Sequence, residues 1–137
     1  MRVVLDSSVL IAAAISRAGV CAELLEDVLS GHELIVSDFI VLEVTRKLKE
    51  KFHFPDSDIK QLRRFLLTAG TVVSPASLPS TVCRDPADVP VIGTAVSGEA
   101  SLLITVDKDL LSLRRYGGVR MIKPGQFWEL SMHGGAS

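Results

Sequence analysis

Two aspartates of this 137-residue chain each follow directly on a short apolar run. Asp6 follows Val3–Leu5 in MRVVLDSSVL, and Asp107 follows Leu102–Val106 in SLLITVDKDLL. The carboxyl ends of parallel strands share one edge of a sheet, and ligands bind there where the strand order reverses. If the two strands are neighbours, carboxylates at about 6 Å repel by roughly 2–3 kcal/mol at an effective dielectric of about 20. A divalent cation would offset this repulsion, and carboxylate oxygens suit hard ions such as Mg²⁺ or Mn²⁺.

Each acid of such a site also has a simpler interpretation. Aspartate is a favoured helix N-cap, and this role suits Asp6 and Asp107 taken singly. Glu43 lies one position off the apolar stripe of its helix and could be a solvated flank residue. Asp88, in RDPADVPVIGTAV, could complement a helix dipole. We interpret Asp109 as an accessory acid, and we interpret the remaining candidates as caps or surface residues: Asp38, Asp85 and Glu99.

The acids are carried by short apolar runs that alternate with longer helical patterns. Continuous apolar runs are typical of strands covered on both faces, and they occur at Val3–Leu5, Leu34–Val36, Thr71–Val73, Leu102–Val106 and Val119–Ile122. Apolar spacings of three and four residues predict helices at about 7–16, 20–30, 38–52, 56–69, 87–98 and 109–115, and a last helix carrying GQFWELSM. The alternation predicts one α/β domain at 1–131 with a central, mainly parallel five-stranded sheet, and a C-terminal tail at 132–137.

Composition limits the classes of function. With 47% hydrophobic and 23% charged residues, the chain can bury a core. The net charge of -1 gives no whole-molecule field that attracts nucleic acid, so a polyanion must meet a local patch or metal ions. Cys21 and Cys83 lack C-x-x-C spacing, which is typical of core residues in a reduced cytoplasmic protein. No apolar run approaches the ~18 residues of a membrane span, so we expect no membrane association.

A local patch of positive charge follows Glu43 in the third helical pattern. It includes Arg46, Lys47 and Lys49. Phosphate contacts of this kind position a nucleic acid without reading its sequence, and we expect RNA to contact these residues. The alternative is an ordinary solvated helix surface, because such surfaces carry charged side chains in most proteins.

Motifs along nearly the whole chain resemble those of the PIN-domain nucleases, particularly the toxins of VapC-type toxin–antitoxin modules. The matching blocks are RVVLDSSVLIAA, LIVSDFIVLEVTRKLKEKF, RDPADVPVIGTAV, GEASLLITVDKDLL and VRMIKPGQFWEL, of which the first and fourth are the most specific. The resemblance implies a PIN-like three-layer α/β/α fold and RNA cleavage that leaves a 5′-phosphate and a 3′-hydroxyl. It also implies a cognate antitoxin that blocks the crevice. Together with the high apolar fraction, it favours a homodimer.

The resemblance assigns roles to individual residues. It implies that four acids bind Mg²⁺ or Mn²⁺ and carry catalysis, namely Asp6, Glu43, Asp88 and Asp107. Thr105 and Asp109 complete the family's T-x-D-x-D pattern around the last of them. Ser8 stands where the family commonly has Asn, and we expect its hydroxyl, like that of Thr105, to orient a metal-bound water. Pro90 and Gly93 also depart from the family, which commonly has ordinary helix formers there.

Two other classes of function stay open. A non-catalytic PIN-like module that binds RNA or protein would be indicated by loss of an acid, and all four are present. A phospho-receiver domain has the right size, and IKP at 122–124 is similar to the Lys-Pro after a receiver's last strand. However, LDSS has a single acid after the first strand, and TVVSPAS has none after the third. A P-loop or Rossmann enzyme is excluded, because no glycine-rich loop follows the first strand.

Overall fold

The apolar runs of the sequence form one central sheet in the computed structural model, which describes residues 1–134 and the side chains of residues 1–130. Its strands are β1 (Arg2–Leu5), β2 (Glu33–Val36), β3 (Thr71–Val72), β4 (Leu102–Ile104), β5 (Arg115–Tyr116) and β6 (Val119–Ile122). They lie in the order β3-β2-β1-β4-β6-β5, and every pair except β5–β6 is parallel. Since β2 and β4 flank β1 on opposite sides, the strand order reverses at β1.

Strand β5 corrects the predicted number of strands from five to six. The helix predicted at 109–115 is shorter, because α6 (Lys108–Leu113) ends before Arg114, whose φ is 63°. The next two residues pair antiparallel with β6 across a turn at Gly117, whose φ of 58° suits glycine. A strand of two residues is too short to show an alternation of apolar and polar side chains, so the sequence pattern does not predict it.

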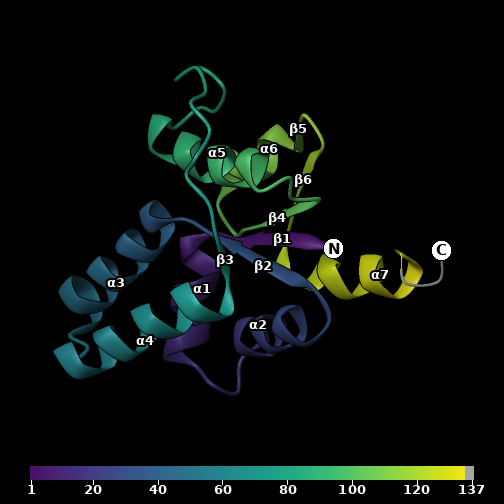
Figure 1. Cartoon of the computed structure of the whole chain (residues 1–137). Helices are drawn as coiled ribbons and strands as arrows, with labels where there is room; N and C mark the ends of the chain where they lie inside the picture. The colour runs from purple at the N-terminus through teal and green to yellow at the C-terminus, as the bar shows by residue number, and fades with distance from the viewer. Residues whose placement is uncertain (135–137) are drawn as a thin grey trace.

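Helices cover both faces of the sheet and give the expected three layers. They are α1 (Ser7–Ile15), α2 (Val20–Gly31), α3 (Asp38–Phe52), α4 (Asp56–Ala69), α5 (Val89–Ser97), α6 and α7 (Pro124–Gly134), with a 3-10 turn η1 (Pro86–Asp88) before α5. In Figure 1, α1, α2 and α4 lie on one side of the sheet, and α5 and α6 lie on the other. Helix α7 extends beyond the start of the tail predicted at 132, and 135–137 lie outside the described residues.

Among the described residues, no single helix is long and apolar enough to cross a membrane. Helices α1 and α2, bent by 110° relative to each other, pass the same test only as a pair, by length and composition.

The core follows the apolar pattern of the sequence. The strand residues Val3–Leu5 and Leu102–Ile104 are all buried, as expected for strands covered on both faces. On α3 the predicted stripe of Ile40, Val44 and Leu48 is buried as well. The stripe fixes the rotation of α3 about its own axis, and it therefore decides which side chains of that helix point along the edge of the sheet.

Gly93 allows the segment before η1 to cross α5. The N–H of Ala76 donates to the carbonyl of Gly93 at 2.9 Å. A Cβ at position 93 would lie 2.5 Å from the carbonyl oxygen of Ala76, a distance at which backbone atoms clash. A helix former would therefore push this segment away. The glycine at this position, where the family commonly has an ordinary helix former, therefore has a steric reason. The segment that it admits leads into η1 and its acids.

Candidate metal centre

Strands β1 and β4 are direct neighbours, and their carboxyl ends bring two aspartates to one edge of the sheet. Leu5 is in register with Ile104, so Asp6 and Asp107 leave the sheet close to the same point. The N–H of Asp6 donates to the carbonyl of Ile104 at 2.9 Å, which continues the ladder past the end of β1. The premise of the predicted crevice, that these two strands are adjacent, is confirmed.

Asp6 is buried, with 4% of its surface exposed, and three donors hold its carboxylate. The N–H of Ser7 donates to Oδ1 at 2.8 Å, and the hydroxyls of Ser8 and Thr105 donate to Oδ2 at 3.1 and 2.8 Å. Burial raises the pKa of Asp6, these hydrogen bonds lower it, and the negative charge of Glu43 raises it further. Ser8 and Thr105, which we expected to orient waters, therefore orient the Asp6 carboxylate itself.

Glu43 reaches the same edge of the sheet from α3. Its carboxylate accepts a hydrogen bond from the hydroxyl of Ser7, the residue that follows Asp6. The ammonium group of Lys47, one turn further along α3, lies 3.7 Å from the same carboxylate oxygen. Nothing in the sequence pattern singles out Ser7, because its contact with Glu43 depends on how α3 packs against α1.

Asp88 has a carboxylate oxygen that is buried without a hydrogen-bond partner in the described part of the chain. Its side chain makes no capping hydrogen bond at the start of α5, and it lies in the first turn of η1, where an acid also complements the helix dipole. Its Oδ2 atom is buried and has no hydrogen-bond partner among the described residues. Burial, followed by the negative charges of Asp107, Asp6 and Asp85, raises the pKa of Asp88 to about 7. A buried polar atom costs free energy unless a protein group, a water or an ion binds it, so a cation bound at this oxygen would recover that cost.

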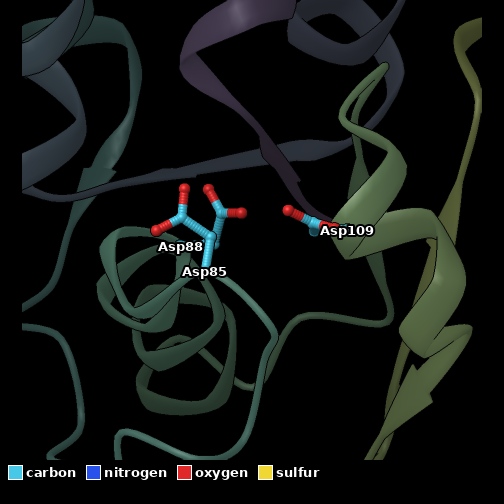
Figure 2. Close-up of side chains that lie close together, drawn as sticks. All are labelled: Asp85, Asp88 and Asp109. Atoms are coloured by element: carbon cyan, nitrogen blue, oxygen red, sulfur yellow. The ribbon is translucent and has the colours of Figure 1, made fainter.

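Asp88 and two neighbouring carboxylates are close enough to share one cation. Oxygens of Asp85, Asp88 and Asp109 lie within 4.8 Å of one another. Figure 2 shows Asp85 and Asp88 side by side on the η1 turn, with Asp109 pointing toward them from α6. Asp109 thus lies where an accessory acid is expected. The predicted capping role of Asp85 is confirmed, because its Oδ1 accepts a hydrogen bond from the N–H of Ala87 at 3.0 Å. Asp85 also belongs to this cluster of acids.

Asp107 combines the two roles that its sequence context allowed. Its Oδ1 accepts from the N–H of Asp109 at 2.8 Å, so it is the N-cap of α6. Its own N–H donates to the hydroxyl of Thr105 at 2.9 Å. Its charge is among the causes that raise the pKa of Asp88, so the capping residue also faces the acid site. Capping and membership of the cluster are compatible, because a carboxylate has two oxygens.

The residues present fit a hard divalent cation. The side-chain donors at this edge are carboxylates and hydroxyls, the oxygen ligands that Mg²⁺ and Mn²⁺ prefer. The unpartnered Oδ2 of Asp88 is the atom that most needs a positive partner. Lys47 is the one cationic side chain that forms an ion pair with a predicted site acid among the described residues, and this acid is Glu43. The remaining negative charge is therefore left for an ion to balance.

The three basic residues of the predicted patch lie in different surroundings. Lys47 faces the site through its ion pair with Glu43. Arg46 is exposed and lines a groove with Glu43, between α3 and the start of α5. Lys49 pairs with Asp56 at the start of α4, at 3.3 Å. Arg46 is thus the member of the patch that lies beside the acid site and remains unpaired among the described residues.

Comparison with known sequences assigns the chain to a protein family that agrees with its fold and its acid site. Residues 2–109 match the PIN domain family, and the chain belongs to this family. PIN domains are in general metal-dependent nucleases. No curated protein sequence matches the chain significantly.

One solved structure has a similar fold. The structure is the crystal structure of VapBC2 from Rickettsia felis bound to a DNA fragment from their promoter. The TM-score is 0.60, with 90% of this chain and 98% of that chain covered and 10% sequence identity. At this identity the likeness shows the fold. The phospho-receiver alternative is excluded, because receivers have the flavodoxin-like order 2-1-3-4-5 and this sheet does not.

Proposed function

We propose that the chain is a metal-dependent endoribonuclease and the toxin component of a toxin–antitoxin module. The observation that carries this proposal is the set of like charges on one sheet edge, centred on the unpartnered Oδ2 of Asp88. Four acids would hold Mg²⁺ or Mn²⁺, namely Asp6, Glu43, Asp88 and Asp107, with Asp85 and Asp109 beside them. When bound, the cation activates a water and stabilises the charge that develops on a phosphodiester and its leaving oxygen.

The protein's own contribution is a rigid, negatively charged frame. Asp6 is held by the hydroxyls of Ser8 and Thr105, and Glu43 is held by the hydroxyl of Ser7. These bonds fix both carboxylates before any ligand arrives, which lowers the cost of ordering them on binding. Asp88, with a pKa of about 7, exchanges a proton readily at neutral pH, so a cation can displace that proton at little cost.

RNA would meet the acid site along α3. Arg46 lies beside Glu43, and its guanidinium suits the geometry of a phosphate. Lys47 can release Glu43 when a cation binds and then contact the strand. Lys49 lies six residues beyond Glu43, about 9 Å along the helix axis, so it would contact a more distant phosphate. Contacts of this kind position the strand, and they make binding dependent on salt.

We also propose a protein partner and a homodimer in the cytoplasm. A groove of about 550 Å³ with mainly apolar walls runs between α1, α2 and α4, and its walls include Leu10, Ala14, Leu25, Phe54, Leu62 and Phe65. A groove of this kind accepts the apolar face of a partner helix. The similar fold in the VapBC2 complex supports an antitoxin as that partner, which we expect to cover this groove and to block the crevice of the acid site.

Cleavage of RNA by the purified protein tests the proposed activity. We expect cleavage with Mn²⁺ or Mg²⁺, none with EDTA, and none from Asp6→Asn. Unchanged cleavage in EDTA or in the variant would contradict the proposal. If the protein binds RNA but cleaves it with none of the divalent cations added, the result would favour the non-catalytic alternative. Light scattering that shows a strict monomer at high concentration would contradict the dimer.

A further inference from the structure

Two buried hydroxyls join the helices that carry Glu43 and Asp88. Ser37 is the N-cap of α3, and Thr94 lies in the middle of α5. Both are completely buried, and their hydroxyl oxygens lie 2.8 Å apart. Neither residue belongs to the acid site, and the two are 57 positions apart in the sequence. The contact therefore exists only because the fold brings α3 and α5 together at the carboxyl end of the sheet.

The protons of this contact can be assigned from the neighbouring groups. The N–H of Ile40 donates to the hydroxyl oxygen of Ser37 at 3.3 Å. The hydroxyl oxygen of Thr94 lies 2.8 Å from the carbonyl oxygen of Pro90, which can only accept. Thr94 has one proton and uses it on Pro90, so Ser37 must donate to Thr94. The result is one directed chain of hydrogen bonds, from Ile40 through Ser37 and Thr94 to Pro90.

The two ends of this chain lie next to the acids. Ile40 precedes Glu43 by three residues on α3, and Pro90 follows Asp88 by two residues at the start of α5. The acids repel one another, and repulsion would push their helices apart unless something fixed the backbone. A fully satisfied chain of buried hydrogen bonds resists that separation, because breaking it would leave polar groups unpaired at low dielectric.

We propose that Ser37 and Thr94 are positioning residues, which hold the helices of Glu43 and Asp88 at the separation that a divalent cation requires. This inference rests on the proposed metal site. It assigns a role in metal affinity to two residues that contact neither metal nor RNA. Buried packing alone would make the same residues matter for stability but not for the affinity of the cation.

Matched variants separate these two roles. Thr94→Val keeps the shape of the side chain and removes its hydroxyl, whereas Thr94→Ser keeps the hydroxyl. Ser37→Ala is a second variant that breaks the chain at its other hydroxyl, while Thr94 can still donate to Pro90. Thr45→Val is the control, since Thr45 is a buried threonine of α3 whose hydroxyl bonds only carbonyls of its own helix, those of Val41 and Leu42.

The measurement is Mn²⁺ binding by calorimetry without RNA, well below the melting temperature of each variant. We expect Thr94→Val and Ser37→Ala to bind Mn²⁺ about tenfold more weakly, the lower limit for loss of outer-shell support. We expect Thr94→Ser and Thr45→Val to bind Mn²⁺ with the affinity of wild type, because both variants keep the chain of hydrogen bonds between α3 and α5. Wild-type affinity in folded Thr94→Val and Ser37→Ala would overturn the inference and leave the proposed function intact. A wild-type chain that binds no Mn²⁺ would overturn both.

Discussion

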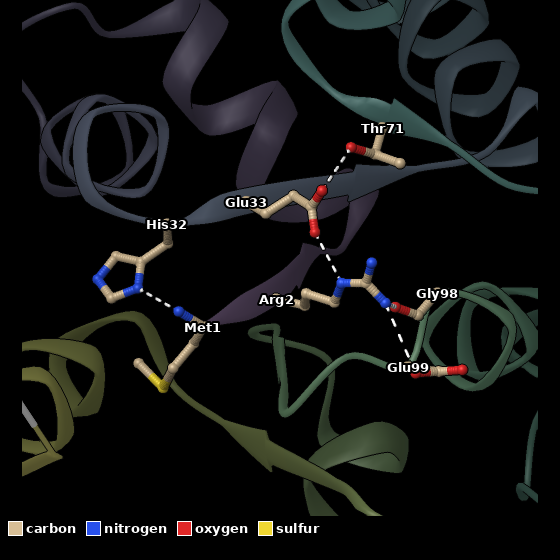
Figure 3. Close-up of polar contacts among 7 residues, drawn as sticks. All are labelled: Met1, Arg2, His32, Glu33, Thr71, Gly98 and Glu99. Atoms are coloured by element: carbon tan, nitrogen blue, oxygen red, sulfur yellow. Dashed lines mark hydrogen bonds and ion pairs between the residues drawn. The ribbon is translucent and has the colours of Figure 1, made fainter. Parts of the chain in front are cut away.

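The two ends of the central sheet treat their carboxylates in opposite ways. At the amino end of the strands, the guanidinium of Arg2 lies 2.7 Å from Glu33 and 3.6 Å from Glu99. Glu33 also accepts from the hydroxyl of Thr71 at 3.1 Å. Figure 3 shows these side chains arranged around Arg2 across neighbouring strands. The hydrogen bonds from Arg2 and Thr71 hold the pKa of Glu33 below its usual range.

At the carboxyl end, the acids outnumber the cations that could balance them. Asp6 accepts hydrogen bonds but forms no ion pair with a described side chain, and burial raises its pKa. Asp88 has an unpartnered oxygen and a pKa of about 7. The acids are thus paired with a cation at the amino edge and, apart from Glu43, unpaired among the described residues at the carboxyl edge. The unpaired acids lower the free energy of unfolding, because they repel one another. This contrast favours a ligand-binding role for the carboxyl edge and a structural role for the amino edge.

The largest expected effect is on activity, and it compares one acid from each edge. Asp107→Asn should lower the cleavage rate by more than about 100-fold, since loss of outer-shell partners alone costs about 10- to 100-fold. Its fold should persist, because Asn caps a helix about as well as Asp. Glu33→Gln should keep the wild-type rate. The measurement is the rate of RNA cleavage at saturating Mn²⁺. Equal losses of rate in Asp107→Asn and Glu33→Gln would contradict the contrast between the two edges.

Metal should stabilise the carboxyl edge in a way that depends on Asp88. At a Mn²⁺ concentration 100 times the dissociation constant, the free energy of unfolding should rise by about 2.7 kcal/mol. Asp88→Asn should lose most of this rise, and Glu33→Gln should keep it. Melting curves with Mn²⁺ and with EDTA give the measurement. A full metal response in Asp88→Asn would show that Asp88 is not a ligand.

Without metal, removing a charge from the carboxyl edge should stabilise the fold. Asp88→Asn in EDTA at pH 7 should gain about 1–2 kcal/mol, because solvent reduces the effect on a half-buried group. The gain corresponds to a rise in melting temperature of roughly 3–8 °C for a domain of this size. Glu33→Gln, which loses a favourable partner for Arg2, should gain nothing. A lower melting temperature for Asp88→Asn would show that its charge is compensated after all.

The smallest effects are opposite slopes of stability with pH. The pKa of Asp88 is raised to about 7, so in EDTA its contribution is present below pH 4 and is lost as pH rises through about 7. The pKa of Glu33 is lowered, so its contribution is present above its unfolded pKa of 4.5 and is lost as pH falls. Asp88→Asn should remove the fall in the free energy of unfolding as pH rises toward 7. Glu33→Gln should remove the fall as pH drops below 4.5. Urea denaturation of wild type and both variants between pH 3 and pH 8 measures these changes. Contributions of Asp88 and Glu33 that change with pH in the same direction would contradict the contrast between the two edges.

Local patterns in the sequence predicted the seven helices and five of the six strands of the described residues, and the candidate acids. Continuous apolar runs predicted the strands on which Asp6 and Asp107 depend, and the stripe on α3 placed Glu43 at its border. These inferences succeed because strand and helix periods are local properties of a chain. Asp85 was within reach of the same reasoning, since it lies three residues before Asp88 in a turn, but its capping role was sufficient to explain it.

Which of these groups meet, and which remain unpaired, depends on how the elements pack against one another. The Ser7–Glu43 hydrogen bond, the cluster around Asp88 and the Ser37–Thr94 contact all join segments that are far apart in the chain. The short antiparallel strand β5 likewise depends on β6 rather than on its own two residues. Burial and partners set the charge state of a carboxylate, and both arise from packing between elements. A sequence therefore shows which residues could form a site, whereas packing decides which of them lack a counter-charge and call for a metal ion.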